Sequence, residues 1–337
     1  MAVLARSDVE GNRIVEEPGT HLLTLSDGRR LAYSDLGDPN GIPIIHHHGM
    51  PGSRLEHEAE PDFYRSLGVR LITPDRPGYG LSDPNPHRLL LDWPSDVAEL
   101  ADSLGIAKFG ILGLSGGGIY ALACAAVIPH RLTDVVVTGC PGPMQRPGAL
   151  AEMRFLTRAG VLLGARAPWL LEAGATVLSP LVRRFPSFFV DHFNNGVPPA
   201  DREWLSMPSV NRGAAETLRE ALRPGVWGYV QDIRVLATPW GFDLDGIDTP
   251  IQLWHGDQDL VIPLHHGRYL ASVLPSATLR ICPGEGHMLM WNHLAEILMA
   301  AAGMLSQPES PQRLPGTGCI ARRRPFTSGV GVDEGPV

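Results

Sequence analysis

Cysteine is scarce in this chain of 337 residues, which contains only four. The spacing of Cys124, Cys140, Cys282 and Cys319 matches neither a disulfide framework nor a metal-ligand motif. Cys124 falls in an Ala-rich helical pattern and Cys140 at a strand end, where both read as small buried hydrophobes. Such cysteine usage is typical of a reducing compartment. We therefore predict a cytoplasmic protein.

Long apolar runs and an excess of basic residues are also missing. The most apolar long stretch, Val161 to Val182, is interrupted by two charged residues and two prolines, so we do not expect a membrane span. Residues 1–20 carry charges and lack the apolar run of a signal peptide. The formal net charge is −8, which argues against a nucleic-acid partner because phosphate binding needs a basic face. The expected partner is a small-molecule substrate, and the oligomeric state stays open.

Strand-like and helix-like patterns alternate over most of the chain. Strands are predicted at 22–25, 30–36, 42–45, 69–73, 108–114, 134–138, 251–256 and 278–282. Helices are predicted at 61–67, 93–104, 119–127, 264–273 and 292–305. Strands that alternate with helices form a parallel sheet with right-handed crossovers. The fold class is therefore α/β, with a mostly parallel central sheet flanked by helices.

The alternation stops after Cys140 and resumes at Ile251. The intervening stretch from Pro141 to Gly246 is far longer than one crossover helix requires, and it contains helical patterns but no good strand. We interpret 141–246 as an inserted helical cap on a catalytic domain made of 20–140 and 247–305. Residues 306–337 lack apolar periodicity and predict a disordered tail.

A nucleophile is indicated where one strand turns into a helix. The sequence Gly113-Leu114-Ser115-Gly116-Gly117 lies between an apolar run and an Ala-rich helix. A sharp strand-to-helix turn projects its central residue outward, and the flanking glycines avoid collisions of a Cβ with neighbouring backbone. Ser115 is therefore the candidate nucleophile. The Gly116 N–H, at the helix start, is a candidate donor to a developing oxyanion.

A serine nucleophile needs a base and a carboxylate that orients it. Downstream of Ser115, Asp257 and Asp259 both follow the strand at 251–256, and His287 follows the last strand. The order serine, acid, histidine is that of α/β-hydrolases. The residues alone leave the choice between the two aspartates open.

Five motifs in this order resemble those of capped serine hydrolases of the α/β-hydrolase fold, over roughly Leu22 to Leu305. They are His48-Gly49-Met50-Pro51-Gly52, the stretch from Asp75 to Ser82, the Ser115 motif, Gly256-Asp257-Gln258-Asp259 and Gly286-His287. The resemblance implies a catalytic triad of Ser115, Asp259 and His287, with Asp257 as a turn former. It also implies that the backbone N–H groups of Met50 and Gly116 form the oxyanion hole.

Neither a metal nor a cofactor is expected. His46, His47 and His48 are consecutive on a strand, so their side chains point to alternate faces and cannot converge on one ion. His48 is expected to brace its loop and to border the substrate site. Aromatic residues of the cap would supply an apolar pocket, and the candidates are Trp169, Phe188 and Phe189.

The expected function is hydrolysis of an ester, thioester or amide of a small to medium, largely apolar substrate through an acyl-enzyme. Two alternatives remain open at this stage. One is a ligand-binding protein of the same fold with slow or no turnover. The other is a C–C hydrolase, lyase or perhydrolase that uses the same triad.

Overall fold

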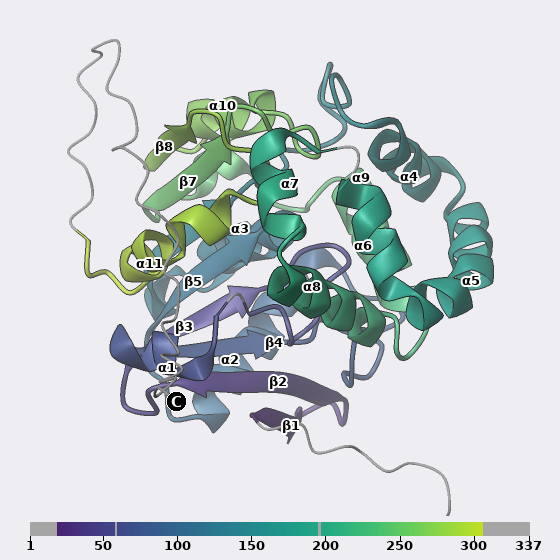
Figure 1. Cartoon of the computed structure of the whole chain (residues 1–337). Helices are drawn as coiled ribbons and strands as arrows, with labels where there is room; N and C mark the ends of the chain where they lie inside the picture. Colours follow the sequence, from purple (N-terminus) through teal and green to yellow (C-terminus); the bar gives the residue numbers. More distant parts are fainter. Residues whose placement is uncertain (1–18, 58, 195–196, 306–337) are drawn as a thin grey trace, which may run out of the picture.

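A computed structural model describes residues 19–57, 59–194 and 197–305 (Figure 1). The tail expected at 306–337, with Cys319, lies outside the described residues. Within these ranges, no helix combines the length and apolarity needed to cross a bilayer.

An eight-stranded sheet forms the centre of the molecule and confirms the predicted fold class (Figure 1). Its strand order is β1-β2-β4-β3-β5-β6-β7-β8; β2 is antiparallel to β1 and β4, and all other pairs are parallel. The strands are β1 (Thr20–Thr24), β2 (Arg30–Gly37), β3 (Ile42–His47), β4 (Val69–Pro74), β5 (Phe109–Leu114), β6 (Leu132–Thr138), β7 (Ile251–Gly256) and β8 (Ala277–Cys282). Every residue of β5 and of β7 is buried, as expected for strands covered on both faces.

The register of the parallel strands aligns their carboxyl ends. His47 pairs with Gly113, Leu114 with Thr138, and Thr138 with Trp254, while Gly256 pairs with Cys282. The loops that follow β3, β5, β6, β7 and β8 therefore leave the sheet from one edge. In open α/β sheets, ligands bind at this edge.

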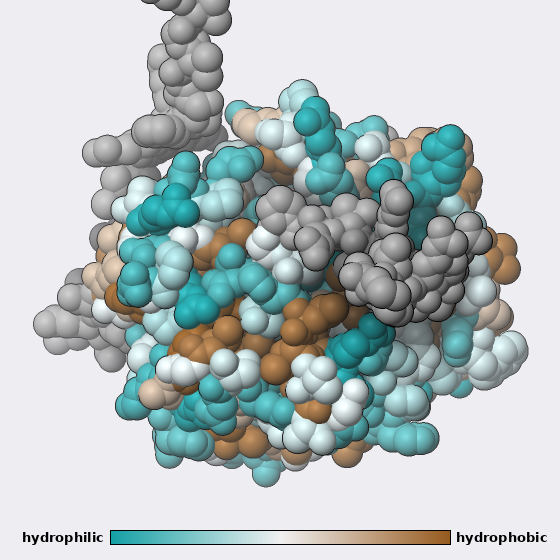
Figure 2. All heavy atoms as spheres, turned by 90° about the horizontal axis from the view of Figure 1, so that it is seen from below, coloured by the Kyte–Doolittle hydropathy of each residue, from teal (hydrophilic) through white to brown (hydrophobic). Residues whose placement is uncertain are grey.

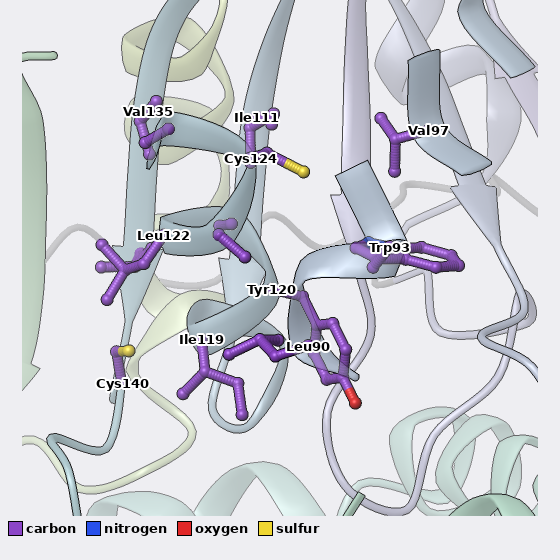
Figure 3. Packing of buried hydrophobic residues seen from close by; sticks show 14 of the residues in the cluster. Leu90, Trp93, Val97, Ile111, Ile119, Tyr120, Leu122, Cys124, Val135 and Cys140 are labelled. Carbon is purple, nitrogen blue, oxygen red and sulfur yellow. The ribbon is translucent and has the colours of Figure 1, made fainter. Parts of the chain in front are cut away.

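Helices cover both faces of the sheet. On one face lie α2 (Trp93–Ser103), α3 (Gly117–Val127) and α10 (His265–Val273), and on the other lie α1 (Pro61–Ser66) and α11 (Leu289–Ala301). Figure 3 shows α3 at the centre of the first layer, with Ile119, Leu122 and Cys124 among its packed side chains. Buried apolar side chains on this helix fix the direction in which the chain leaves β5.

The described residues between Cys140 and Ile247 contain helices and no strand. We call this stretch, residues 141–246, the helical segment. These helices lie on the side toward which the arrows of β3 and β4 point (Figure 1). They are α4 (Phe155–Arg166), α5 (Pro168–Arg184), α6 (Pro186–Asn194), α7 (Pro199–Leu205), α8 (Pro208–Ala221) and α9 (Trp227–Ala237), followed by the short turn η3 (Leu244–Gly246).

The closing helix differs from its predicted range of 292–305. It begins at Leu289, because Leu289 and Met290 pack into the core, and it ends at Ala301. Gly303 follows with φ of +68°, the left-handed conformation that commonly terminates helices.

Candidate active site

Ser115 occupies a strained turn between β5 and α3. Its φ is +52°, which is rare for a residue with a side chain and typical of functional sites. A Cβ at Gly113 would lie 2.8 Å from the Cα of Gly118, and one at Gly117 would collide with the carbonyl oxygen of His47. Glycine is therefore needed at 113 and 117 for the predicted reason, because the turn packs directly on the neighbouring strand and helix.

His287 and Asp259 meet at the same edge of the sheet. His287 Nδ1 lies 2.7 Å from Asp259 Oδ2, and both side chains are buried. The other carboxylate oxygen of Asp259 accepts the N–H groups of Val261 and Ile262, each at 2.8 Å. The carboxylate is thus held by its own loop while it faces the imidazole ring.

The end of β6 connects this pair to Ser115. The Ser115 N–H donates to Thr138 O at 2.8 Å, and Gly139 follows Thr138. A Cβ at Gly139 would lie 3.1 Å from the His287 ring and 3.4 Å from Asp259 Oδ2. Gly139 also has a φ of +55°, so both its conformation and this close approach favour glycine where β6 ends near the histidine.

The net effect of its surroundings raises the pKa of His287. Burial lowers this pKa, but the charge of Asp259, its hydrogen bond to the ring, and the charges of Asp201 and Glu56 outweigh burial. Protonation of His287 is thus favoured by three carboxylates. This is the electrostatic setting in which a histidine accepts a proton readily.

Asp257 and Asp259 have different surroundings. Asp257 is exposed, and its carboxylate accepts the Gly284 N–H at 2.7 Å. Of the two aspartates, Asp259 is the one paired with His287.

The loop after β3 brings Met50 next to Gly116, the two residues whose backbone N–H groups are the expected oxyanion donors. The side chain of Met50 lies so close to Gly116 that a Cβ on Gly116 would collide with it. No hydrogen bond within the described residues uses the N–H of Met50 or of Gly116. A Cβ at Gly49 would lie 3.9 Å from the Cβ of Ser115, so this loop borders the serine.

His48 braces the same loop. Its Nε2 accepts the Arg76 N–H at 3.2 Å, and its Nδ1 lies 2.9 Å from Gly49 O, so both ring nitrogens contact backbone. Burial and the nearby Arg76 charge hold the pKa of His48 well below its usual value. The described residues contain no group of three or more His, Cys, Asp or Glu side chains arranged for a metal ion, and this includes His46 and His47.

Arg76 and Asp232 form a buried ion pair that sequence reasoning did not identify. The Arg76 guanidinium donates to the carbonyl oxygens of His48 and Gly49, and to Asp232 Oδ2 at 2.7 Å. Asp232 lies on α9, and both side chains of the pair are fully buried. A residue of the helical segment therefore helps to hold the loop that carries Met50.

Glu56 was also missed. Its Oε1 accepts the Gly49 N–H at 2.7 Å. Burial raises the pKa of this carboxyl to about 7, against the lowering effects of the Gly49 N–H, Arg76 and His287. Only the fold places this residue by the site, because the loop that carries it has no periodicity or motif that marks it.

Asp201 on α7 contacts the histidine loop. Its two carboxylate oxygens accept the N–H groups of His287 at 2.8 Å and Met288 at 2.9 Å. The side chain is almost fully buried, and burial raises the pKa of its carboxyl despite these two hydrogen bonds.

The aromatic candidates for the pocket do not gather at Ser115 in the contacts described. Trp169 on α5 and Phe188 on α6 are exposed, and Phe189 packs edge-to-face on Phe188. A role of these three aromatic residues in substrate binding therefore stays a prediction. Their exposed positions do not support it.

Comparison with known proteins agrees with the fold. The α/β hydrolase fold family matches residues 42–294. The chain is 28% identical to a non-heme chloroperoxidase of Streptomyces lividans, over 80% of this chain and 94% of that protein. It is 27% identical to a proline iminopeptidase of Xylella fastidiosa strain 9a5c, over 79% and 90% of the two chains.

A solved structure, that of a hydrolase from Pseudomonas aeruginosa PA01, matches with a TM-score of 0.62 and 22% identity, over 85% of this chain and 99% of the other. At this identity the match reports the fold. With the profile match over most of the chain and the sheet order found here, the protein belongs to the α/β hydrolase fold family.

Proposed function

We propose that the protein is a serine hydrolase that cleaves a carboxylic ester through Ser115, His287 and Asp259. The observation that carries this proposal is the buried Asp259–His287 pair at the same edge of the sheet as Ser115, which lies in a left-handed turn and is joined to the pair through the end of β6. A protein that only binds a ligand has no chemical need for this combination. Related thioesters and amides are open to the same chemistry.

The geometry supports a two-step reaction. Ser115 Oγ attacks the carbonyl carbon while His287 Nε2 takes its proton, and Asp259 stabilises the imidazolium through Nδ1–H. The N–H groups of Met50 and Gly116 stabilise the negative charge on the carbonyl oxygen. His287 then protonates the leaving alcohol. In the second step it activates a water that hydrolyses the acyl-enzyme.

We propose that 141–246 acts as a cap over this site, on the catalytic domain of 20–140 and 247–305. Two contacts support the assignment: Asp201 of α7 with the His287 loop, and Asp232 of α9 with Arg76. A cover at this edge of the sheet excludes water and strengthens the oxyanion donors. The proposed substrate is a small to medium ester. Its largely apolar character is supported here by the Met50 side chain beside Gly116.

One alternative is favoured by a specific observation, the similarity to a non-heme chloroperoxidase. In that case hydrogen peroxide, in place of water, attacks the acyl-enzyme and releases a peracid. Both reactions need the same acyl-enzyme at Ser115, so the nucleophile test applies to both, and the yield of peracid in added peroxide separates them.

The test is fluorophosphonate labelling combined with hydrolysis of p-nitrophenyl esters of increasing chain length. The wild-type protein should be labelled at Ser115 and should turn over the shorter esters. Ser115→Ala should lose labelling and about 10⁴-fold or more in kcat, because triad residues act as a unit. Labelling of the alanine variant, or a wild-type protein that binds esters without cleaving them, would contradict the proposal.

A further inference from the structure

The helices α4 to α6 expose an unusual amount of apolar side chain. Fifteen large hydrophobic residues are exposed in the described part of the chain, and nine of them lie between 155 and 188. They are Phe155, Leu156, Trp169, Leu170, Val177, Leu178, Leu181, Phe185 and Phe188. Exposed apolar residues scattered singly are ordinary, but a concentration of this kind marks an interaction site.

On α5 these residues form one face. Trp169, Val177 and Leu181 recur at intervals of eight and four residues, with Leu170 and Leu178 beside them, and Phe185 follows directly after the last residue of the helix. The six residues therefore lie along the exposed side of α5 and at its end. We call this set of six residues the α5 face. Val177 is 78% exposed and Trp169 is 70% exposed. Figure 2 shows hydrophobic atoms at its right-hand edge, the side on which α5 lies in Figure 1.

The opposite side of α5 accounts for its packing. Leu171, Ala175 and Val182 pack against the buried cluster of Leu222, Val226 and Val230. The α5 face is therefore not needed to hold the helix in place. A helix of 17 residues is about 25 Å long, so the face is an extended apolar strip.

Exposed arginines flank this strip. Arg166 precedes α5, while Arg183 and Arg184 end it; Arg158 lies on the neighbouring α4. The only acidic residue of α4 and α5 is Glu172, so the two helices carry a local positive charge in a chain of net charge −8. Charges beyond a Debye length of about 8 Å are largely screened. A partner that contacts the α5 face therefore experiences the positive charge of the nearby arginines more than the net negative charge of the chain.

This charge decides between a second copy of the chain and a membrane. A two-fold axis perpendicular to α5 would run two α5 helices antiparallel and set Arg166 of one copy toward Arg183 and Arg184 of the other, and an axis parallel to α5 would set Arg183 and Arg184 beside their own copies. Like charges would then face each other. An anionic bilayer instead neutralises the arginines while the α5 face enters the acyl boundary, as in helices that lie in the interface plane.

We propose that α5 docks the protein on the surface of an anionic lipid membrane, with the α5 face inserted and Arg166, Arg183 and Arg184 at the headgroups. The long arginine side chains reach the headgroups while their stems stay in apolar surroundings. The proposal does not depend on the chemistry at Ser115. Ser115→Ala is expected to bind vesicles as the wild type does.

Co-sedimentation of the full chain with vesicles tests this. Binding to phosphatidylcholine vesicles that contain phosphatidylglycerol should be at least about tenfold stronger than binding to pure phosphatidylcholine, since each arginine near an anionic surface adds to the attraction. Trp169→Glu with Val177→Glu should weaken binding by about tenfold or more, because the apolar insertion is lost. Arg183→Gln with Arg184→Gln should weaken binding to the anionic vesicles only.

The control is Leu89→Glu, because Leu89 is also an exposed leucine, at 68% exposure, but lies far from α5 in the sequence. It directly precedes the short turn η1 (Leu90–Asp92). This variant should bind as the wild type does, and circular dichroism should show all variants folded. Absence of wild-type binding would overturn the proposal, as would equal losses in the α5 and Leu89 variants. Sedimentation velocity that shows a dimer dissociated by Val177→Glu would assign the face to a second copy instead.

Discussion

Asp259 and Asp257 stand two residues apart on one loop, yet only Asp259 faces the imidazole of His287. In the proposed mechanism, Asp259 selects the tautomer with the proton on Nδ1, which leaves Nε2 free to accept the proton of Ser115. A carboxylate at this position also raises the pKa of the ring. The structure thus distinguishes Asp257 from Asp259, two side chains that look equivalent in the sequence.

We predict that Asp259→Asn lowers kcat by about 10⁴-fold, because the amide favours the wrong tautomer of His287. The acid limb of the pH–rate profile should shift to lower pH, since the charge that raises the pKa of His287 is removed. Asp257→Asn is the matched control and should cost much less, although it alters the hydrogen bond to Gly284. Ester hydrolysis by the purified variants measures both effects, and the reverse ranking would contradict the assignment.

Glu56 gives a prediction about stability. Its pKa of about 7 in the folded protein lies above the ordinary 4.5, so the folded state binds the proton more tightly than the unfolded state does. The stabilisation from this proton is fully present below pH 4.5 and is lost as the pH rises through 7. It amounts to about 3 kcal/mol, because each tenfold difference in proton affinity between the two states corresponds to about 1.4 kcal/mol.

Glu56→Gln should therefore be more stable than the wild type at pH 8 by up to about 3 kcal/mol and similar to it at pH 5, because the neutral amide keeps an acceptor for the Gly49 N–H. Urea unfolding at the two pH values measures this. Glu60→Gln, on an exposed side chain, is the control for the substitution itself. If the wild type were instead the more stable protein at pH 8, ionisation of Glu56 would cost the folded state little free energy, which would contradict the prediction.

Among the helices and strands, the sequence predicted the features that depend on residues close together in the chain. The elbow glycines, the alternation of strands and helices, and the apolar runs all act locally, so the fold class was confirmed. The contacts of Asp201 with His287 and of Arg76 with Asp232 join residues 86 and 156 positions apart. No local pattern marks such partners, because their pairing exists only when α7 and α9 have packed on the strand ends.

We predict that Asp201 is a positioning residue through which α7 holds the His287 loop. Asp201→Asn can accept only one of the two N–H groups, so kcat/KM should fall by about ten- to a hundredfold as the imidazole loses alignment. The acid limb should also move to lower pH, because the Asp201 charge raises the pKa of His287. A purely structural role would leave that limb in place.

Asp191→Asn provides the comparison for Asp201, because Asp191 is an exposed carboxylate of the same helical segment and accepts a hydrogen bond from Asn211 at 2.7 Å. It should keep wild-type kcat/KM and an unshifted pH profile. If Asp201→Asn behaved in the same way, α7 would have no part in holding the histidine.

At the scale of the whole molecule, Asp232 joins the helical segment to the sheet. From α9 it accepts hydrogen bonds from Tyr79 at 3.0 Å and Tyr120 at 2.7 Å, and it pairs with Arg76 and Arg88. Arg76 and Tyr79 follow β4, and Tyr120 lies on α3. Two buried guanidinium groups thus depend on one carboxylate, whose pKa their charges lower in spite of its burial.

We predict that Asp232→Ala lowers the free energy of unfolding by about 3–5 kcal/mol, because it leaves buried arginines without a counter-charge. Asp102→Ala, which removes the exposed partner of Arg131, should cost less than about 1 kcal/mol. Urea unfolding followed by circular dichroism and tryptophan fluorescence measures both. If the helical segment and the sheet form one cooperative unit, the two signals coincide in the wild type and separate in Asp232→Ala, as the segment loosens first. Equal stability of the two variants would show that the ion pairs of Asp232 do not hold the segment on the sheet.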